Sequence, residues 1–248
     1  MALLLLEREW IMKKGNRLTR LEKSWILYDV GNSAFTLLVS TLLPIYFNAL
    51  ASGAGLNEDL YLSYWGYAGS IATILVAFIG PICGALSDRR GFKKPIFILS
   101  VLIGVAGCVL LGVPNGWLAF LIVFVVAKVG YHSSLVFYDS MLPEITTEER
   151  IDNVSTQGYA WGYIGSVIPF VACLVLVLAG GSFGISQSTG MVLSFILTAA
   201  WWLIFTMPLL RRYKQTAYVQ AGRHPVAEAF KQIANTFKKA KEQKEAEV

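Results

Sequence analysis

Hydrophobic residues along the chain gather in long uninterrupted blocks and do not alternate with polar positions. Each block is close to the roughly 20 residues that a helix needs to cross the ~30 Å hydrocarbon core at about 1.5 Å per residue. Short polar or charged segments separate the blocks. The pattern therefore predicts six membrane-spanning helices, at residues 25–50, 64–86, 95–113, 117–138, 158–178 and 191–210.

The composition agrees with this pattern and excludes two classes of protein. The 248 residues are 55% hydrophobic and 15% charged, with a mean hydropathy of +0.56, whereas soluble domains are about 25% charged. The chain is therefore a polytopic all-α membrane protein rather than a soluble enzyme or a nucleic-acid binder. The net charge of +5 does not change this conclusion, because the basic residues are concentrated in a few short segments between the blocks.

The placement of lysine and arginine predicts the orientation. Of the 21 basic residues, 20 precede the first block, follow the last one, or lie in the connections at 87–94 and 139–157. The alternate connections at 51–63, 114–116 and 179–190 contain none. Because basic segments stay on the cytoplasmic side, we expect both termini in the cytoplasm. Short loops favour a bacterial inner membrane.

Three regions follow from these blocks: a cytoplasmic segment at 1–24, a six-span bundle at 25–210 and a basic tail at 211–248. From Pro225 the tail places apolar residues at helical spacing on one face, namely Val226, Phe230, Ile233 and Phe237. This pattern suits an amphipathic helix on the inner membrane surface. A solvated linker helix is the alternative.

The connection between the second and third blocks carries a motif. Residues 84–94 read GALSDRRGFKK, which resembles the signature loop of the major facilitator superfamily. Five residues match in place: Gly84, Asp88, Arg89, Gly91 and Lys93. Phe92 departs from the basic residue usual there. The resemblance implies a gating loop, with Asp88 at a helix N-terminus of the opposite half, where the helix dipole favours an anion. The alternative is that these are solvated charges that set topology.

Three further segments narrow the resemblance. They read WILYDVGNSAF at 25–35, FYDSMLP at 137–143 and STQGYAWGYIG at 155–165, and they are similar to segments of the vacuole-effluxer-like permeases, a branch related to autophagy. The resemblance implies a secondary transporter of a small organic solute. An amino acid is favoured, because the fungal relatives move neutral amino acids out of the vacuole.

The superfamily fold has twelve spans in two halves with the site between them, and this chain contains six. Twelve spans need about 240 residues for their helices alone. The resemblance therefore implies the N-terminal half, which is a fragment, one of two separately encoded halves, or a unit that pairs as a parallel homodimer. The expected partners are the lipid bilayer, the solute and such a second half. A non-transporting remnant or assembly subunit is the competing function.

Polar residues within the first block form a stripe at helical spacing. Asp29, Asn32 and Ser33 begin it, and Thr36 and Ser40 continue it. A charged residue in a span costs about 2.5–3.5 kcal/mol on insertion scales, so it usually faces a cavity or a partner. We interpret Asp29 as a cavity-lining acid that could bind a coupling proton. A packing carboxylate near the membrane interface is the alternative.

The fourth block contains a second polar group. Lys128 lies near its middle, about 15 Å from either interface at about 1.5 Å per residue, and a midplane ammonium would suit a substrate carboxylate. An ion pair with Asp29 or Asp139 is the alternative. Tyr131 and His132 share its side, with His132 as a proton relay or a packing residue. With Asp139, these residues complete the predicted solute or ion pathway.

The remaining residue patterns point to packing. Gly158, Gly162 and Gly165 place small residues on one side of the fifth block, which lets helix backbones approach closely. The three cysteines lie within hydrophobic blocks without metal-ligand spacing. No catalytic arrangement and no phosphate-binding loop is present, so we expect no enzymatic activity, no metal and no cofactor.

Overall fold

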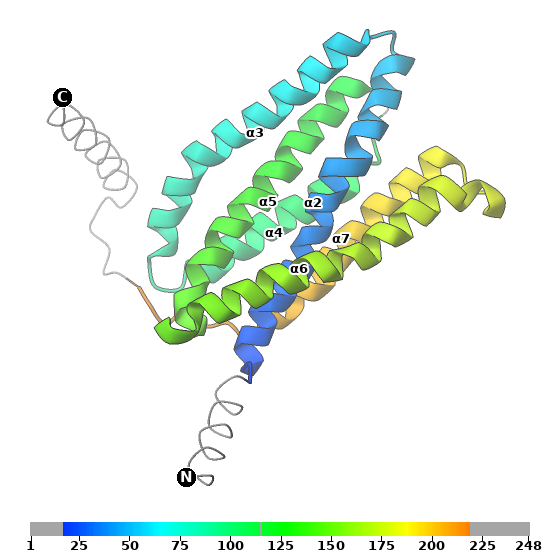
Figure 1. Cartoon of the computed structure of the whole chain (residues 1–248). Coiled ribbons are helices and arrows are strands. Elements are labelled where there is room, and N and C mark those ends of the chain that lie inside the picture. The colour runs from blue at the N-terminus through cyan, green and yellow to red at the C-terminus, as the bar shows by residue number, and fades with distance from the viewer. Residues whose placement is uncertain (1–16, 115, 219–248) are drawn as a thin grey trace, which may run out of the picture.

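The structure is a computed structural model that describes residues 17–114 and 116–218. Six helices in these ranges are long and hydrophobic enough to cross a membrane (Figure 1). They are α2 (Arg20–Gly53), α3 (Glu58–Ser87), α4 (Lys93–Leu110), α5 (Trp117–Ile145), α6 (Ile151–Leu174) and α7 (Gln187–Arg212). A 3₁₀ turn, η1 (Glu148–Arg150), precedes α6, and a π turn, η2 (Val175–Ala179), and a 3₁₀ turn, η3 (Gly180–Phe183), follow it. The predicted all-α class and the six spans are confirmed.

Helix α2 begins five residues before the predicted block, because a capping box starts it. The Thr19 side chain accepts a hydrogen bond from the Glu22 amide at 3.1 Å, and the Thr19 amide donates to the Glu22 carboxylate at 2.6 Å. This reciprocal pair satisfies two amides that would otherwise lack partners at the helix start. Arg150 also donates to Glu22, at 3.0 Å, and so ties this end of α2 to the α5–α6 connection.

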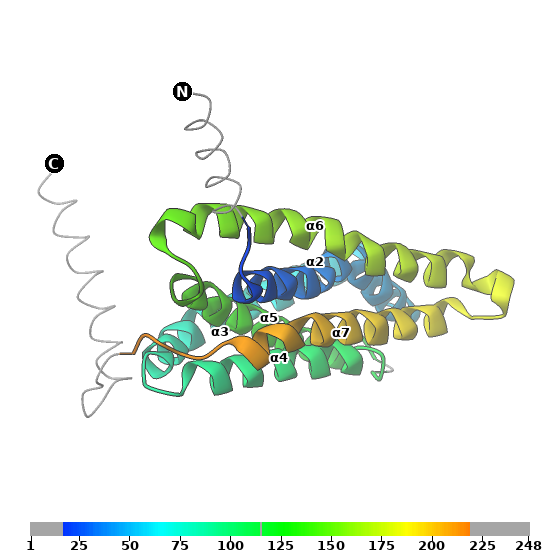
Figure 2. The same ribbon diagram turned by 90° about the horizontal axis from the view of Figure 1, so that it is seen from below.

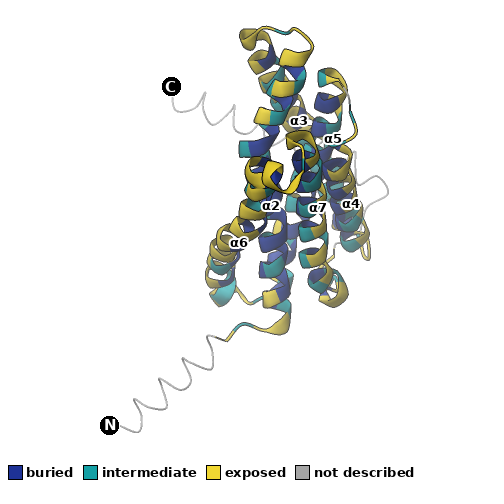
Figure 3. Cartoon of the chain, turned by 90° about the vertical axis from the view of Figure 1, so that its right-hand side faces the viewer, coloured by how far each residue is buried: buried dark blue, intermediate teal, exposed yellow. Residues whose placement is uncertain are grey.

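The helices form two interlocking groups (Figures 1 and 2). Helix α2 packs against α6 and α7, and α4 packs against α5 and α7. Helix α3 packs chiefly against α5 and stands at one side of the bundle. Only 6% of its most hydrophobic 18-residue stretch is buried, against 33–44% for the other spans (Figure 3). The bundle therefore holds α3 by a single face.

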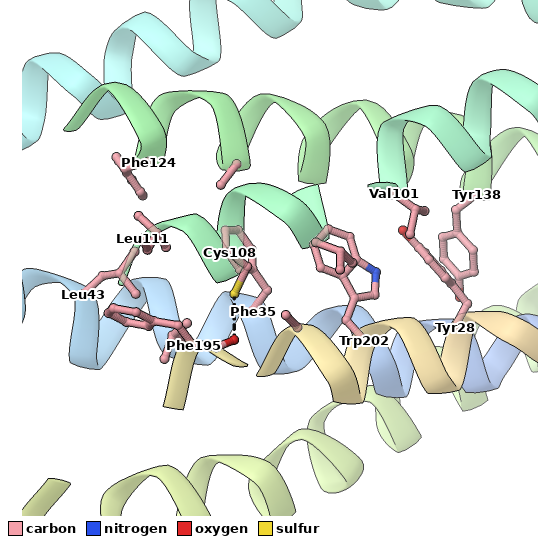
Figure 4. Packing of buried hydrophobic residues seen from close by; sticks show 14 of the residues in the cluster. Tyr28, Phe35, Leu43, Val101, Cys108, Leu111, Phe124, Tyr138, Phe195 and Trp202 are labelled. Carbon is pink, nitrogen blue, oxygen red and sulfur yellow. Dashed lines mark hydrogen bonds between the residues drawn. The ribbon is translucent and has the colours of Figure 1, made fainter. Parts of the chain in front are cut away.

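Aromatic side chains fill the centre of the bundle. The Trp202 ring on α7 is fully buried beside Phe35 (Figure 4), with 5.6 Å between the centres of the two rings. The centre of the Tyr131 ring lies 5.8 Å from that of Trp202. Trp202 packs directly over Gly104, where an added Cβ would lie 2.4 Å from the indole. The glycine is therefore what allows α4 to approach α7 at this level.

Close packing of α6 on α2 depends on the predicted glycines. A Cβ on Gly158 would lie 2.6 Å from the Trp25 ring, and one on Gly165 would lie 2.4 Å from Val30. Both distances are shorter than side chains tolerate, so the packing role predicted for these glycines is confirmed.

Residues 213–218 follow α7 without regular secondary structure, and the first of them, Tyr213, has an extended backbone. We call this segment the strap. It runs across the end of the bundle that carries the α3–α4 connection, which we call the basic end. The amphipathic helix predicted from Pro225 lies outside the described residues.

Candidate functional site

A cavity of about 340 Å³ opens between α2, α5 and α6. Its volume lies in the range of small-molecule sites, about 300–1,000 Å³. The polar and aromatic side chains that line it are Trp25, Asp29, Asn32, Ser33, Thr36, Tyr131, Tyr138, Asp139, Ser155, Tyr159, Tyr163 and Ser166. Polar side chains gathered between three helices of a hydrophobic bundle identify this cavity as the candidate site.

Asp29 lies on the α2 wall and contacts α6 through a glycine. Its Oδ1 accepts a hydrogen bond from Asn32 Nδ2 at 3.3 Å. A Cβ on Gly162 would lie 2.9 Å from Asp29 Oδ2 and 3.0 Å from Ser33 Oγ. Gly162 therefore leaves the room in which the Asp29 carboxylate and the Ser33 hydroxyl sit.

The α2 and α5 walls are joined by a hydrogen bond between side chains. The hydroxyls of Thr36 and Tyr131 are 2.7 Å apart. Deeper in the bundle, the hydroxyls of Tyr28 and Ser134 are 2.6 Å apart and make a second link between the same helices. These bonds hold the two walls at a defined separation.

The structure brings together five of the seven predicted pathway residues in this cavity, namely Asp29, Asn32, Ser33, Tyr131 and Asp139. It places the other two, Lys128 and His132, outside the cavity lining. The Lys128 ammonium lies 5.7 Å from the centre of the Phe124 ring and near Gly69 of α3. The His132 ring lies 5.2 Å from the Tyr131 ring. Lys128 thus points toward α3, and within the described ranges it makes no ion pair with Asp29 or Asp139.

Sequence reasoning missed much of the aromatic lining. Tyr159 and Tyr163 lie one helical turn apart on α6, and their hydroxyls are 3.1 Å apart. Trp25 and Tyr138 stack with ring centroids 4.2 Å apart. The spacing of Tyr159 and Tyr163 could have signalled a shared face, but only the position of α6 beside α2 shows that the face meets Asp29.

The predicted gating residues lie at the basic end. Asp88 follows the last turn of α3 and is exposed, and Gly91 has a φ of +80°, which glycine adopts without strain. Lys93 is buried and forms an ion pair of 2.6 Å with Glu144 at the end of α5. Nothing in the described chain lies within 4 Å of a Cβ placed on Gly84. The Nε of Arg89 is buried without a hydrogen-bond partner among the described residues.

The strap is bound to this loop through Glu144 and Gln215. The Glu144 carboxylate accepts hydrogen bonds from the amides of Thr216 and Ala217, at 2.6 and 3.0 Å. The Gly91 amide donates to the Gln215 side chain at 2.9 Å, which in turn donates to the Ser87 carbonyl. These hydrogen bonds hold the strap against the α3–α4 loop.

Tyr213 anchors the start of the strap. Its hydroxyl donates to Glu144 Oε1 at 3.0 Å. Burial and the adjacent Glu144 carboxylate both raise the pKa of the Tyr213 phenol, so it stays protonated and remains a donor to this carboxylate at physiological pH.

Comparison with known proteins agrees with the fold and the motif. A family model described as vacuole effluxer Atg22 like matches residues 19–248. The chain belongs to this Atg22-like family. A relative from Bacillus subtilis (strain 168), named an uncharacterized MFS-type transporter, YxiO, is 36% identical over 231 residues. The match covers 91% of this chain and 54% of that relative.

The Atg22-like chain thus spans about half the length of the relative it matches. The matched half contains the cavity, the α3–α4 loop and the strap. No group of three or more His, Cys, Asp or Glu residues within the described part of the chain is arranged to hold a metal ion.

Proposed function

We propose that this chain is the N-terminal half of a secondary active transporter that moves a small organic solute by alternating access. The observation that carries the proposal is the polar cavity between α2, α5 and α6 inside a hydrophobic six-span bundle. Family membership and the half-length match support it. In such transporters the site lies between two rigid halves that rock against each other.

The remaining parts of the proposal concern how such a transporter would work. The solute is an amino acid, as in the fungal effluxers that the sequence resembles. Asp29 binds a coupling proton, and the 84–94 loop closes the site at the basic end, which faces the cytoplasm. The second half is a separate polypeptide, the rest of a longer chain, or another copy of this bundle. The membrane is a bacterial inner membrane.

Flux measurements test the transport activity. The chain would be reconstituted in liposomes loaded with a mixture of the twenty amino acids, both alone and fused to the part of the Bacillus subtilis relative that it does not cover. Mass spectrometry of the external solution would measure efflux with and without a pH gradient. We expect efflux from a preparation with two halves, and loss of the effect of the gradient in the Asp29→Asn variant.

Lys128 tests a separate part of the proposal. If its ammonium contacts the solute at some stage of transport, Lys128→Ala should abolish flux in the assembled protein. Lys23→Ala, at an exposed position near the start of α2, is the matched control and should retain flux. Equal flux in both variants would remove Lys128 from the pathway.

A non-transporting remnant or assembly subunit is the second candidate. The half-length match favours it, because one half alone cannot enclose a site from both sides. Absence of efflux from every preparation, at every pH gradient, would favour this candidate over a transporter.

A further inference from the structure

The charges that line the cavity have one sign. Asp29 and Asp139 are its two ionisable carboxylates, on the facing helices α2 and α5. Its lining contains no lysine, arginine or histidine, since Lys128 and His132 lie elsewhere. An occupant that carries a positive charge would be attracted by this lining, and an anion would be repelled.

Neither carboxylate has a cationic partner within the described ranges. The ion pairs in these ranges join Lys93 to Glu144 and Arg150 to Glu22, both away from the cavity. The one side-chain donor to Asp29 is the neutral amide of Asn32. Carboxylates within a membrane-spanning bundle usually pair with one another, with a cation or with water, so this pair is available to a cationic ligand.

An unpaired hydroxyl points independently to a ligand. Tyr138 lines the cavity and is only 3% exposed, yet its hydroxyl has no hydrogen-bond partner among the described residues. A buried polar group left without a partner costs about 1–3 kcal/mol. The phenol oxygen can accept a hydrogen bond from an N–H group, as can both carboxylates.

The rest of the lining is aromatic. Trp25 stacks on Tyr138, and Tyr131, Tyr159 and Tyr163 complete the aromatic part of the wall. Aromatic faces attract cations within about 6 Å of the ring centre. Acceptor oxygens, negative charge and aromatic faces therefore occur together, and a protonated amine satisfies all three.

We propose that the cavity binds the ammonium group of a small organic amine, with Asp139 and the deprotonated form of Asp29 as its counter-ions and the Tyr138 hydroxyl as a further acceptor. The assignment rests on the proposed transport function and identifies the group of the solute, its protonated amine, that this cavity holds. A cavity of about 340 Å³ is large enough for a small amine with a hydrophobic body.

Binding of three probes of nearly equal shape would test the charge selectivity. They are phenethylammonium, the neutral phenethyl alcohol and the anion phenylacetate, titrated calorimetrically into the purified chain in lipid nanodiscs. We expect phenethylammonium to bind at least about tenfold more tightly than the alcohol and phenylacetate not to bind. No binding of phenethylammonium, or equal binding of the alcohol, would overturn the proposal.

Substitutions of the lining residues test whether phenethylammonium binds in this cavity. Asp29→Asn and Asp139→Asn each keep the size of the side chain, and each should weaken phenethylammonium binding about tenfold or more. Tyr138→Phe should weaken it severalfold. Asp152→Asn, on the exposed start of α6, is the matched control and should bind as the unmodified chain does. Unchanged binding in both cavity aspartate variants would overturn the assignment, and intact thermal unfolding would show that each variant is folded.

The outcomes separate this assignment from transport itself. Selective binding of the ammonium without flux in any preparation would support the amine site and contradict the transport function. Flux of neutral or anionic solutes without ammonium binding would support transport and overturn the amine site.

Discussion

Gly162 controls the space around the most confined carboxylate of the cavity. Its missing side chain leaves room for Asp29 Oδ2 and Ser33 Oγ, each within about 3.0 Å of where a Cβ would lie. The sequence identified this glycine as a packing residue between helices. The structure shows that it also shapes the candidate site, because the α2 face against which it packs carries Asp29.

We therefore expect Gly162→Ala to disturb the cavity more than the fold. The new methyl group must displace two short side chains, not backbone, so the helices can stay in place. Affinity for phenethylammonium should fall about five- to tenfold, which corresponds to about 1–1.4 kcal/mol. Gly66→Ala, where nothing lies within 4 Å of the added Cβ, should bind normally. Equal affinities in the two variants would contradict this role for Gly162.

The sequence shows that Lys128 lies within a hydrophobic block but does not show which residues its side chain contacts. An ammonium in the middle of a hydrophobic block is costly enough to be noticed from the sequence alone. Which neighbour it faces depends on the rotation of α5 about its own axis. The structure turns it toward Phe124 and α3, whereas Tyr131, less than one turn away, faces the cavity.

At the scale of the helices, glycines allow close approaches between backbones. Gly104 and Gly130 bring the backbones of α4 and α5 together, since a Cβ on Gly130 would lie 2.4 Å from the Gly104 amide. Gly104 also accommodates the Trp202 ring of α7. One small residue thus allows three helices to meet.

Gly104→Ala should consequently destabilise the bundle. The Cβ would lie 2.4 and 2.8 Å from two carbon atoms of a fully buried indole that has little room to move. Overpacking of this kind costs about 1–3 kcal/mol. The thermal unfolding temperature in detergent should fall relative to Gly80→Ala, whose added Cβ meets nothing within 4 Å. A fall of the same size in both variants would argue against overpacking as the cause.

The strap is joined to α4 and α5 by the Glu144 carboxylate. Lys93, Tyr213, Thr216 and Ala217 all donate to it. Hydrogen bonds to a charged group contribute about 1.5–3 kcal/mol each, more than neutral ones. The strap should therefore come loose when this charge is removed.

Glu144→Gln tests this attachment. We expect amide hydrogen exchange at Thr216 and Ala217 to speed up about tenfold or more, while exchange in the core of α5 stays unchanged. Glu148→Gln, at an exposed position of η1, is the control. Unaltered exchange in the strap of the Glu144 variant would mean that Gln215 and its neighbours hold it without the carboxylate.

At the scale of the whole molecule, the basic end collects the start of α2, the α3–α4 and α5–α6 connections, and the strap (Figure 1). The sequence predicts that this end faces the cytoplasm, because basic residues resist translocation. The opposite end contains the α2–α3, α4–α5 and α6–α7 connections, in which lysine and arginine are absent from residues 51–63, 114–116 and 179–190.

Cysteine labelling would test this orientation. In a variant whose three native cysteines are replaced by alanine, S52C and F92C place single thiols at exposed positions on opposite ends. A membrane-impermeant maleimide should label S52C on intact cells and F92C only after the membrane is opened. The reverse pattern would invert the topology.

The linear sequence alone determined the class of protein, the number of spans and their approximate positions. The length of a hydrophobic block is a property of the chain itself, and the bilayer thickness sets the length required. The helix ends predicted from the sequence were less accurate than the positions of the spans. Helix α2 begins at a capping box, and α5 continues to Ile145, past the hydrophobic block.

Only the tertiary structure decided which polar residues meet. Asp29 and Asp139 share a cavity with Tyr159 and Tyr163 because α6 packs on α2 through its glycines. Lys128 does not join them, because α5 turns it toward α3. The periodicity of a single helix shows which residues share a face, but the neighbour of that face is chosen by the packing of all six helices together.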